Sequence, residues 1–253
     1  MLHTTPRGWV PDLPDHRDQR YDAPNKVLRK LPSSVNLTKL CPPVYNQGDL
    51  NSCTAHAIGA AYQFELLRQN REEVFMPSRL FIYYNERAME GNIKSDSGAM
   101  IRNGIKSVNK QGVCPEDMWP YNFALFASKP TTACYARALS HQVLSYQRVK
   151  RSLTQMKSCL AEGYPFVFGF TVFNSFNSKE VKRSGKLNMP KKTEKDDGGH
   201  AVLAVGYSDS AKRFIVRNSY GTKWGKQGYF TMPYNYLLDE DLADDFWTLR
   251  VIE

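Results

Sequence analysis

The chain has no long apolar run and no apolar leader. Within its 253 residues, no stretch approaches the roughly 18 apolar residues that a membrane-spanning helix needs. Residues 1–19 are interrupted by proline and aspartate and hold no apolar signal-peptide core, so we expect no signal peptide in this chain. These absences are typical of a soluble protein, and they leave both a secreted and a cytoplasmic location open.

Metal-binding and nucleic-acid-binding patterns are also missing. The cysteines are Cys41, Cys53, Cys114, Cys134 and Cys159. No C-x-x-C pair occurs among them, and we expect no metal and no cofactor. If one cysteine is catalytic, the other four permit up to two disulfides, so free thiols and one or two bridges all stay open.

The positive charge has no nucleic-acid pattern either. The formal net charge is +9, but the positive residues are spread along the chain. Their densest run, residues 179–195, also contains acidic residues and lacks a basic motif with interleaved aromatics. This favours a solvated basic loop, and we expect no nucleic-acid partner.

What remains is an ordinary globular composition, 42% hydrophobic and 23% charged. No internal repeat or low-complexity tract appears, and a chain of this length buries a core as one large domain or as two lobes that share a cleft. Helical apolar spacing dominates the first half. We expect helices over residues 53–68, 77–89, 100–112 and 154–160.

Strand-like apolar runs dominate the second half. We expect strands over residues 165–173, 201–207, 214–218 and 228–232, of which the middle two form a hairpin. Residues 121–150 read as a mixed connector and residues 174–199 as a long polar loop. Helices followed by strands argue for an α+β protein with two lobes.

The first 30 residues form a proline-rich arm without a helical or strand period. Trp9, Val10 and Leu13 are apolar anchors by which such an arm packs across the protein's own surface, and a floppy terminus is the alternative. We therefore divide the chain into an N-terminal extension, residues 1–30, and a two-lobed domain, residues 31–253.

Cys53 stands where a loop gives way to the first helical pattern, just after Asn51 and Ser52, which are N-cap residue types. A thiol in the first turn of a helix meets unpaired backbone N–H groups and the positive end of the helix dipole. Both favour the thiolate, which is the nucleophile. A small buried cysteine without reactivity is the alternative.

A reactive Cys53 needs a base, and His200 is the best placed of the five histidines. It follows a Gly-Gly pair at the start of a strand, where the backbone turns sharply and leaves room beside the ring. Asn218 ends the partner strand of the hairpin, so its carbonyl oxygen can accept from one imidazole nitrogen and aim the other at the thiol. His56 shares the Cys53 helix, and we expect it to pack or cap.

Four ordered stretches carry a resemblance to a known family. They are Gln47-Gly48-x-x-x-Ser52-Cys53, GVCPEDMWPY at 112–121, HAVLAVGY at 200–207 and NSYGTKWGKQGY at 218–229. In order and spacing they resemble the papain family of cysteine peptidases, from about Leu31 to the C-terminus. The resemblance implies a papain-like fold with a helical left lobe, an antiparallel β-barrel-like right lobe and an active-site cleft between them.

The resemblance also implies a hydrolase, a thiol protease in which Cys53 is the nucleophile and His200 is the general base and then acid. Asn218 orients the imidazole, and Gln47 with the Cys53 N–H forms the oxyanion hole. The pair of Cys53 and His200 is expected to rest largely as thiolate and imidazolium. Trp224 matches the family's indole that covers the contact between asparagine and histidine.

A substrate-binding set follows from the same resemblance: Gly98, Met100, Gly198, Gly199, Ala201 and Trp224. Gly98 keeps the bare backbone suited to pairing with an extended substrate. Met100, Gly198 and Ala201 would line a roomy apolar pocket for the second residue before the scissile bond, which predicts a preference for a bulky apolar side chain there. Peptides or proteins are the implied substrates and proteinaceous inhibitors the implied partners, and we expect a monomer.

The chain also departs from the family pattern. Leu50 stands where a disulfide cysteine is common, Thr54 and His56 replace aromatic residues, and Tyr220 replaces tryptophan. Such features resemble bacterial-type, xylellain-like members. A short arm replaces the long helical pro-segment, and we hypothesise that it lies in or near the cleft and restrains activity, as in a zymogen. The alternatives are a catalytically silent papain-fold binding module and a Cys-His-Asn acyltransferase.

Overall fold

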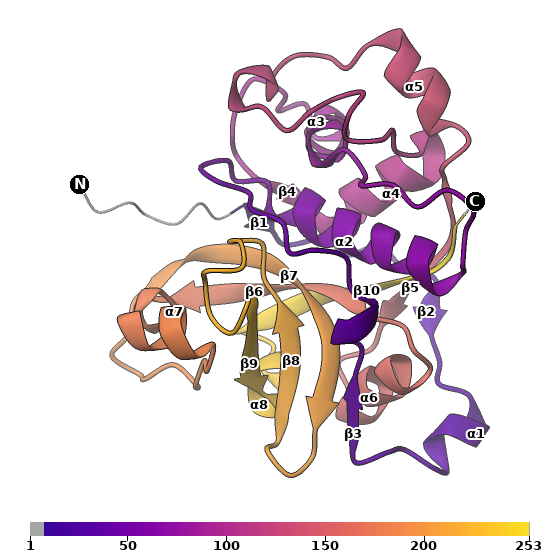
Figure 1. Ribbon diagram of the computed structural model, residues 1–253. Helices are drawn as coiled ribbons and strands as arrows, with labels where there is room; N and C mark the ends of the chain where they lie inside the picture. The colour runs from indigo at the N-terminus through magenta and orange to yellow at the C-terminus, as the bar shows by residue number, and fades with distance from the viewer. Residues whose placement is uncertain (1–7, 253) are drawn as a thin grey trace.

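Helix α2 (Cys53–Arg68) runs between the two halves of the molecule in the computed structural model, which describes residues 8–252. Helices lie on one side of α2 and a large sheet lies on the other (Figure 1). Every residue of α2 from Cys53 to Leu66 is buried, because the helix is mostly apolar or small around its whole circumference. This central position fixes where the helix begins, and Cys53 is its first residue.

The helices other than α2 are α1 (Asn25–Leu28), α3 (Arg79–Met89), α4 (Ile101–Gln111), α5 (Thr132–Ala138), α6 (Leu153–Ala161), α7 (Lys179–Ser184) and α8 (Tyr234–Leu238). The two longest helices after α2, α3 and α4, also lie in the first half of the chain, and the shorter helices are spread along its length. Short 3-10 turns span Thr38–Leu40, Phe123–Leu125 and Asn174–Asn177. Helices α3 and α4 pack with α2 to form the helical lobe.

The strands build mainly the other lobe. They are β1 (Trp9–Val10), β2 (Arg20–Tyr21), β3 (Ser34–Asn36), β4 (Ala99–Met100), β5 (Val143–Val149), β6 (Phe166–Phe173), β7 (Asp196–Ser208), β8 (Arg213–Arg217), β9 (Tyr229–Pro233) and β10 (Ala243–Ile252). The large sheet has the order β2-β5-β10-β6-β7-β8-β9, with β3 paired to β7. Its pairs are antiparallel except β2 with β5.

The register of this sheet places the catalytic candidates. Strands β6 and β7 pair with Gly169 opposite Ala201 and Phe170 opposite His200. Strand β7 pairs with β8 through Leu203 and Arg217, so Asn218 follows directly at the end of β8. The hairpin therefore carries His200 and Asn218 to the same edge of the sheet, facing the start of α2.

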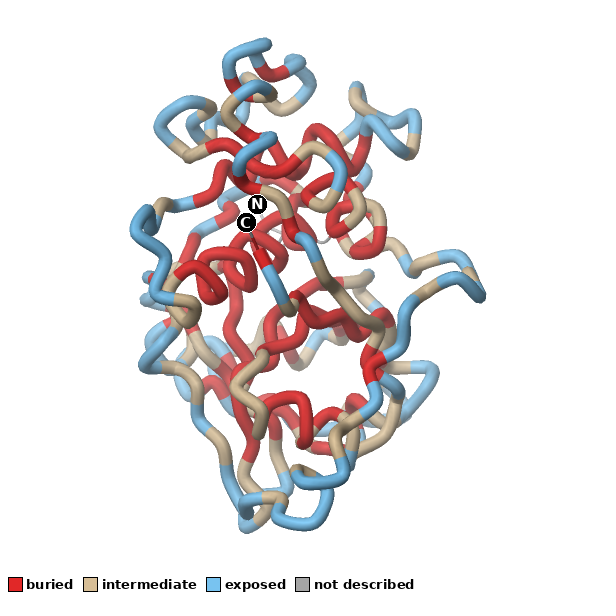
Figure 2. The backbone as a smooth tube through the Cα atoms, turned by 90° about the vertical axis from the view of Figure 1, so that its right-hand side faces the viewer, coloured by how far each residue is buried: buried red, intermediate tan, exposed pale blue. Residues whose placement is uncertain are grey.

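Two hydrophobic clusters fill the lobes. One joins α2, α3 and α4 to the face of the sheet that α2 covers, and the other lies on the opposite side of the sheet and is rich in phenylalanine. Figure 2 shows the buried backbone gathered through the middle of the molecule and the exposed backbone in the loops around its outline. The expected α+β fold with two lobes is confirmed.

Several expected elements match the structure, and others were missed. The helix predicted over 53–68 has the predicted bounds, and the hairpin of β7 and β8 is present. The expected connector over 121–150 is wrong, because it contains α5 and β5. The expected polar loop over 174–199 contains α7 and the start of β7. Strand β10 was not predicted, although it lies at the centre of the sheet between β5 and β6.

None of the helices in residues 8–252 has the length and apolarity to cross a membrane. All five cysteines fall within this range, and all are free thiols. Of the alternatives that the sequence left open for the cysteines, the structure shows free thiols.

The sheet-lobe core gives a first prediction. Phe168 on β6 is fully buried and stacks on Phe246, with ring centroids 5.9 Å apart, so Phe168→Ala leaves a cavity. We expect this change to lower the free energy of unfolding by about 3–5 kcal/mol. Leu144→Ala on β5 is the control, because that side chain is 54% exposed and should cost under about 0.5 kcal/mol. Urea denaturation measures both, and equal costs would contradict this account of the core.

Candidate active site

The Cys53 loop is held in place by hydrogen bonds to the loop before β4. The backbone N–H of Asn51 donates to Asp96 Oδ1 over 3.0 Å, and Asn51 Nδ2 donates to the Asp96 carbonyl over 2.7 Å. Tyr83 Oη donates to Asp96 Oδ1 over 2.5 Å and fixes the carboxylate in turn. Asp96, which the sequence analysis missed, thus ties down a loop in which Leu50 leaves no cysteine for a bridge.

The N-cap of α2 differs in detail from the expectation. Ser52 occupies the cap position, but its hydroxyl contacts Tyr121 Oη over 2.6 Å and does not cap the helix. His56 Nδ1 lies 2.9 Å from the Ser52 carbonyl oxygen, to which it can donate. His56 is fully buried, and burial lowers its pKa to about 3, so it stays neutral. The expectation that His56 packs or caps is confirmed.

Cys53, His200 and Asn218 lie together, as the sequence predicted. His200 Nε2 donates to Asn218 Oδ1 over 2.8 Å, and this bond fixes the imidazole tautomer. The next residue, Ala201, donates its backbone N–H to Cys53 Sγ over 3.3 Å. Since Asn218 takes Nε2, Nδ1 is the nitrogen that can serve the thiol. The part of β7 that contains His200 and Ala201 therefore brings the imidazole to the first turn of α2.

Gln47 is held in a fixed orientation against Ser219, the residue after Asn218. Its Oε1 accepts from Ser219 Oγ over 2.6 Å, and its Nε2 donates to the Leu50 carbonyl over 2.9 Å. The backbone is held as well, because Gln47 N–H donates to the Ser219 carbonyl over 2.9 Å. An amide nitrogen carries two hydrogens, so one remains for an oxyanion.

The ring that covers His200 is Tyr220 and not Trp224. Tyr220 stacks on the imidazole, with ring centroids 4.9 Å apart and planes inclined by 25°. Trp224 packs edge-on against Tyr220 at 5.8 Å and lies 5.2 Å from Phe176, so it forms a second layer. The expected role of Trp224 is corrected on this point: the aromatic residue next to the Asn-Ser pair is nearer in space to the imidazole.

The protonation state of Cys53 also differs from the expectation. The side chain has no exposed surface, and burial raises the pKa of the thiol to about 12. The N–H groups of Ala201 and Gly8 oppose this rise, because they stabilise the thiolate. Burial therefore opposes the expected resting thiolate in this form of the protein, in which the sulfur is cut off from water.

The arm is what covers the sulfur. Strand β1 pairs in parallel with β4, Trp9 beside Ala99 and Val10 beside Met100, and Ala99 N–H donates to the Gly8 carbonyl over 2.7 Å. A Cβ on Gly8 would lie 1.6 Å from the Asn51 carbonyl oxygen, so only glycine fits there. One on Gly98 would lie 2.2 Å from the Gly8 carbonyl oxygen. The predicted substrate-binding residues Gly98 and Met100 both contact the arm.

The indole of Trp9 fills a slot in the sheet lobe, which we call the Trp9 slot and define by Gly169, Gly199 and Asp245. A Cβ on Gly169 would lie 2.0 Å from the indole, and one on Gly199 would lie 2.7 Å from it. Trp9 Nε1 donates to Asp245 Oδ2 over 3.0 Å at the end of the slot. Gly199 was a predicted substrate-binding residue, whereas Gly169 and Asp245 were missed because neither lies in a family motif.

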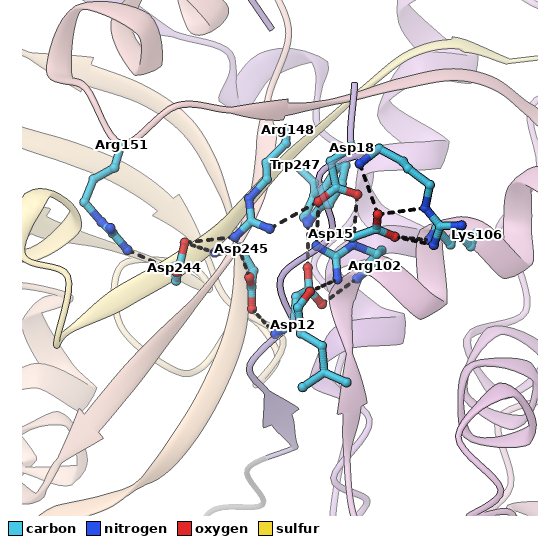
Figure 3. Close-up of polar contacts among 12 residues, drawn as sticks. Asp12, Asp15, Asp18, Arg102, Lys106, Arg148, Arg151, Asp244, Asp245 and Trp247 are labelled. Carbon is cyan, nitrogen blue, oxygen red and sulfur yellow. Dashed lines mark hydrogen bonds and ion pairs between the residues drawn. The ribbon is translucent and has the colours of Figure 1, made fainter. Parts of the chain in front are cut away.

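Farther along, acidic side chains hold the arm (Figure 3). Asp18 pairs with Arg102 over 2.5 Å and with Arg148 over 3.3 Å. Asp12 accepts from the Arg102 backbone N–H over 3.0 Å and from Trp247 Nε1 over 2.9 Å. These carboxylates come from the arm, and their partners come from α4, β5 and β10.

The apolar anchors of the arm were only partly predicted. Trp9 is an anchor, but the Leu13 side chain is 67% exposed, so its expected anchoring role is wrong. Gly198 is exposed at the start of β7, and Ala201 is buried beside Cys53. His3 lies outside the described residues. Within residues 8–252 there is no group of three or more His, Cys, Asp or Glu residues that could hold a metal ion.

Comparisons with known proteins agree with this geometry. The family model described as papain family cysteine protease matches residues 31–241. An uncharacterized peptidase C1-like protein of Acanthamoeba polyphaga mimivirus is 42% identical, over 97% of this chain and 86% of the relative.

Solved structures give the same result. The crystal structure of xylellain, a cysteine protease from Xylella fastidiosa, is 44% identical and superposes with a TM-score of 0.93, over 99% of this chain and 97% of that one. A procathepsin B from Trypanosoma congolense shares the fold at a TM-score of 0.77 with 16% identity, over 98% of this chain and 86% of that one. With its thiol, imidazole and amide in one cleft, this chain belongs to the papain family and is a papain-like cysteine peptidase.

Proposed function

We propose that the protein is a cysteine endopeptidase that works through an acyl-enzyme on Cys53 and is restrained by its own arm. One observation carries the catalytic part. His200 is bound to Asn218 over 2.8 Å, while its chain neighbour Ala201 touches the Cys53 sulfur at 3.3 Å. An oriented imidazole next to a thiol at a helix N-terminus is the arrangement that activates a sulfur nucleophile.

The reaction follows from these atoms once the arm has left the cleft. His200 Nδ1 takes the thiol proton, and the thiolate attacks the carbonyl carbon of the scissile bond. The oxyanion accepts hydrogen bonds from Gln47 Nε2 and the Cys53 N–H. His200 then gives its proton to the leaving amine, and a thioester remains on Cys53.

Hydrolysis of the thioester completes the cycle. Water gives a proton to His200 and attacks the thioester carbonyl carbon, which releases the acid and restores the thiol. Asn218 keeps the imidazole in one orientation through both proton transfers. The stacked ring of Tyr220, 4.9 Å from His200, restricts the access of water to that contact.

Thiol labelling and product analysis test this function. With the arm displaced by Gly8→Ala, an epoxide thiol probe should label Cys53, and peptide hydrolysis should accompany labelling. Cys53→Ala should abolish both, whereas Cys41→Ala, at another free thiol, should abolish neither. A peptide amide should release free amine without incorporating an added amine. An unlabelled Cys53 would favour a silent module, and amine incorporation would favour an acyltransferase.

The arm supports restraint because of the atom that it presents to the sulfur. The Gly8 N–H faces Cys53 Sγ, so the group that the described part of the arm presents to the sulfur is a hydrogen-bond donor and not a carbonyl carbon. Its backbone also takes the place beside Ala99 and Met100. An arm of the same chain has a high effective concentration at the cleft, so it competes well with substrate.

Several contacts keep the arm in this position. Gly8 fits against Asn51, Trp9 fills its slot, and Asp12 and Asp18 bind α4, β5 and β10 (Figure 3). Removing residues 1–30 would also remove β2, whose Tyr21 is buried and donates to Glu162 over 2.5 Å. A substitution that displaces the arm while leaving β2 in the sheet is therefore the cleaner test.

Gly8→Ala is that substitution. The added Cβ would overlap the Asn51 carbonyl, so we expect the arm to leave the cleft and kcat/KM on a peptide to rise at least about tenfold, which corresponds to about 1.4 kcal/mol of lost arm binding. Leu13→Ala is the matched control within the arm, because that side chain is exposed, and it should leave activity unchanged. If Gly8→Ala folds and has the activity of Leu13→Ala, the arm does not restrain the enzyme.

A further inference from the structure

Asp245 closes the end of the Trp9 slot, and its two oxygens have different partners. The residue is 1% exposed. Oδ1 accepts from Arg148 Nη2 over 3.0 Å, within the sheet lobe. Oδ2 accepts from Trp9 Nε1 over 3.0 Å and from the Asp12 backbone N–H over 2.8 Å, and both donors belong to the arm. One oxygen is therefore satisfied by the body of the protein and the other by a removable segment.

The slot lies where a substrate side chain would go. Gly8 contacts the Cys53 sulfur. Trp9 is the next residue of the arm, so the slot holds the side chain of the residue adjacent to the one that contacts the thiol. Its wall residue Gly199 belongs to the predicted substrate-binding set, and Gly169 pairs with Ala201, which belongs to the predicted pocket for the second residue before the scissile bond. Trp9 thus shows the shape of side chain that this pocket accepts.

Displacement of the arm leaves Asp245 Oδ2 without the two arm donors. A buried acceptor that loses its donors is costly, so a substrate that supplies an N–H at this point is favoured over one that does not. With the arm in place, burial and the charge of Asp12 raise the pKa of Asp245 to about 7. Departure of the arm removes the Asp12 carboxylate together with the two arm donors, and Asp245 Oδ2 then faces the emptied slot.

The charges around Asp245 favour a neutral donor over a cation. In the sheet lobe, Arg148 pairs with Asp245 over 3.0 Å and with Asp244 over 3.2 Å, and Arg151 pairs with Asp244 over 3.2 Å. Arg102 also lies near, over the ring of Trp247 at 5.6 Å. When the arm leaves, Asp12, Asp15 and Asp18 go with it and these arginines stay. The slot then needs a hydrogen-bond donor and no further positive charge.

We propose that Asp245 makes this pocket select peptide substrates with tryptophan, a flat neutral side chain ending in an N–H donor, at the second position before the scissile bond. This inference rests on the proposed peptidase function and narrows the expected preference for bulky apolar side chains. The glycine walls admit a flat apolar ring, and Asp245 favours a ring that carries an N–H donor over one that does not. Asp245 is thus a specificity-determining residue and takes no part in the bond-breaking steps.

The test measures the hydrolysis of three peptides, of which the first two differ in one atom group. One has tryptophan at this position, and the other has benzothienylalanine, which has the same shape without the N–H. A third has arginine. The enzyme is the full chain carrying Gly8→Ala and Trp9→Ala, so that the arm leaves the slot empty. We expect kcat/KM for tryptophan to exceed that for each of the other two at least about tenfold.

Two variants in this background show whether Asp245 is responsible. Asp245→Asn tolerates the backbone angle φ of 58°, and Arg148, which only donates, turns the amide oxygen toward itself and the NH2 group toward the slot. The ratio of tryptophan to benzothienylalanine should therefore fall to about one. Asp244→Asn is the matched control, because Asp244 also pairs with Arg148 but does not contact Trp9, and it should keep the ratio.

The outcomes separate this inference from the function on which it rests. Equal hydrolysis of the two ring peptides, a preference for arginine, or an unchanged ratio in Asp245→Asn overturns the role of Asp245 while leaving the peptidase intact. No hydrolysis of any peptide, together with an unlabelled Cys53, overturns the peptidase function itself. Should Asp245→Asn fail to fold, the pair of ring peptides decides the matter without it.

Discussion

The burial of the Cys53 sulfur is the constraint on which the rest of this structure depends. The thiol lies with no exposed surface between the first turn of α2, the lip of β7 and the arm. Removing water from a thiol disfavours its charged form, and here this effect outweighs the backbone N–H groups that favour the thiolate. Burial therefore opposes ionisation of the nucleophile in a centre where the other catalytic groups are already in place.

This arrangement links the covered state of Cys53 to the pocket that we propose for a substrate side chain. The same slot that holds Trp9 lies in the wall expected to take a substrate side chain, and the same oxygen of Asp245 that binds the arm faces that pocket. Under the proposed restraint, a substrate replaces contacts that the arm already makes. The close fits at Gly8, Gly169 and Gly199 explain why the arm can enter so deeply, since any larger residue at these positions would overlap its neighbour.

The sequence predicted those parts of the molecule that follow from local patterns and from family motifs. The bounds of α2, the hairpin that carries His200 and Asn218, and the grouping of these residues with Cys53 all agree with the structure. Strand β10 was missed because its Asp-Asp pair and charged end hide the apolar run, although tertiary pairing on both sides stabilises it. Asp96 and Asp245 were missed because their partners lie far away in sequence.

Tyr220 stacks on His200 where Trp224 was expected, and Leu13 is exposed where an anchor was expected. Both differences have a similar cause. The sequence indicates which aromatic residues lie near an active site, but packing decides which of their rings stacks on the imidazole. The protonation of Cys53 could not be predicted from its motif, because it depends on the arm that covers it. The sequence thus predicts which residues form the motif, whereas their protonation state depends on the residues that enclose them.

The protonation state of the Cys53 thiol is the most direct test, and the ultraviolet absorbance of the thiolate reports it. A pH titration of the chain, with the Cys53→Ser spectrum subtracted, isolates this sulfur from the other four cysteines. A raised pKa means that docking keeps the proton on sulfur and that rising pH opposes docking. We expect thiolate only toward pH about 12 with the arm docked, and thiolate already below neutral pH in Gly8→Ala, where the pair with His200 forms in water. Identical titration curves for the two chains would contradict this expectation.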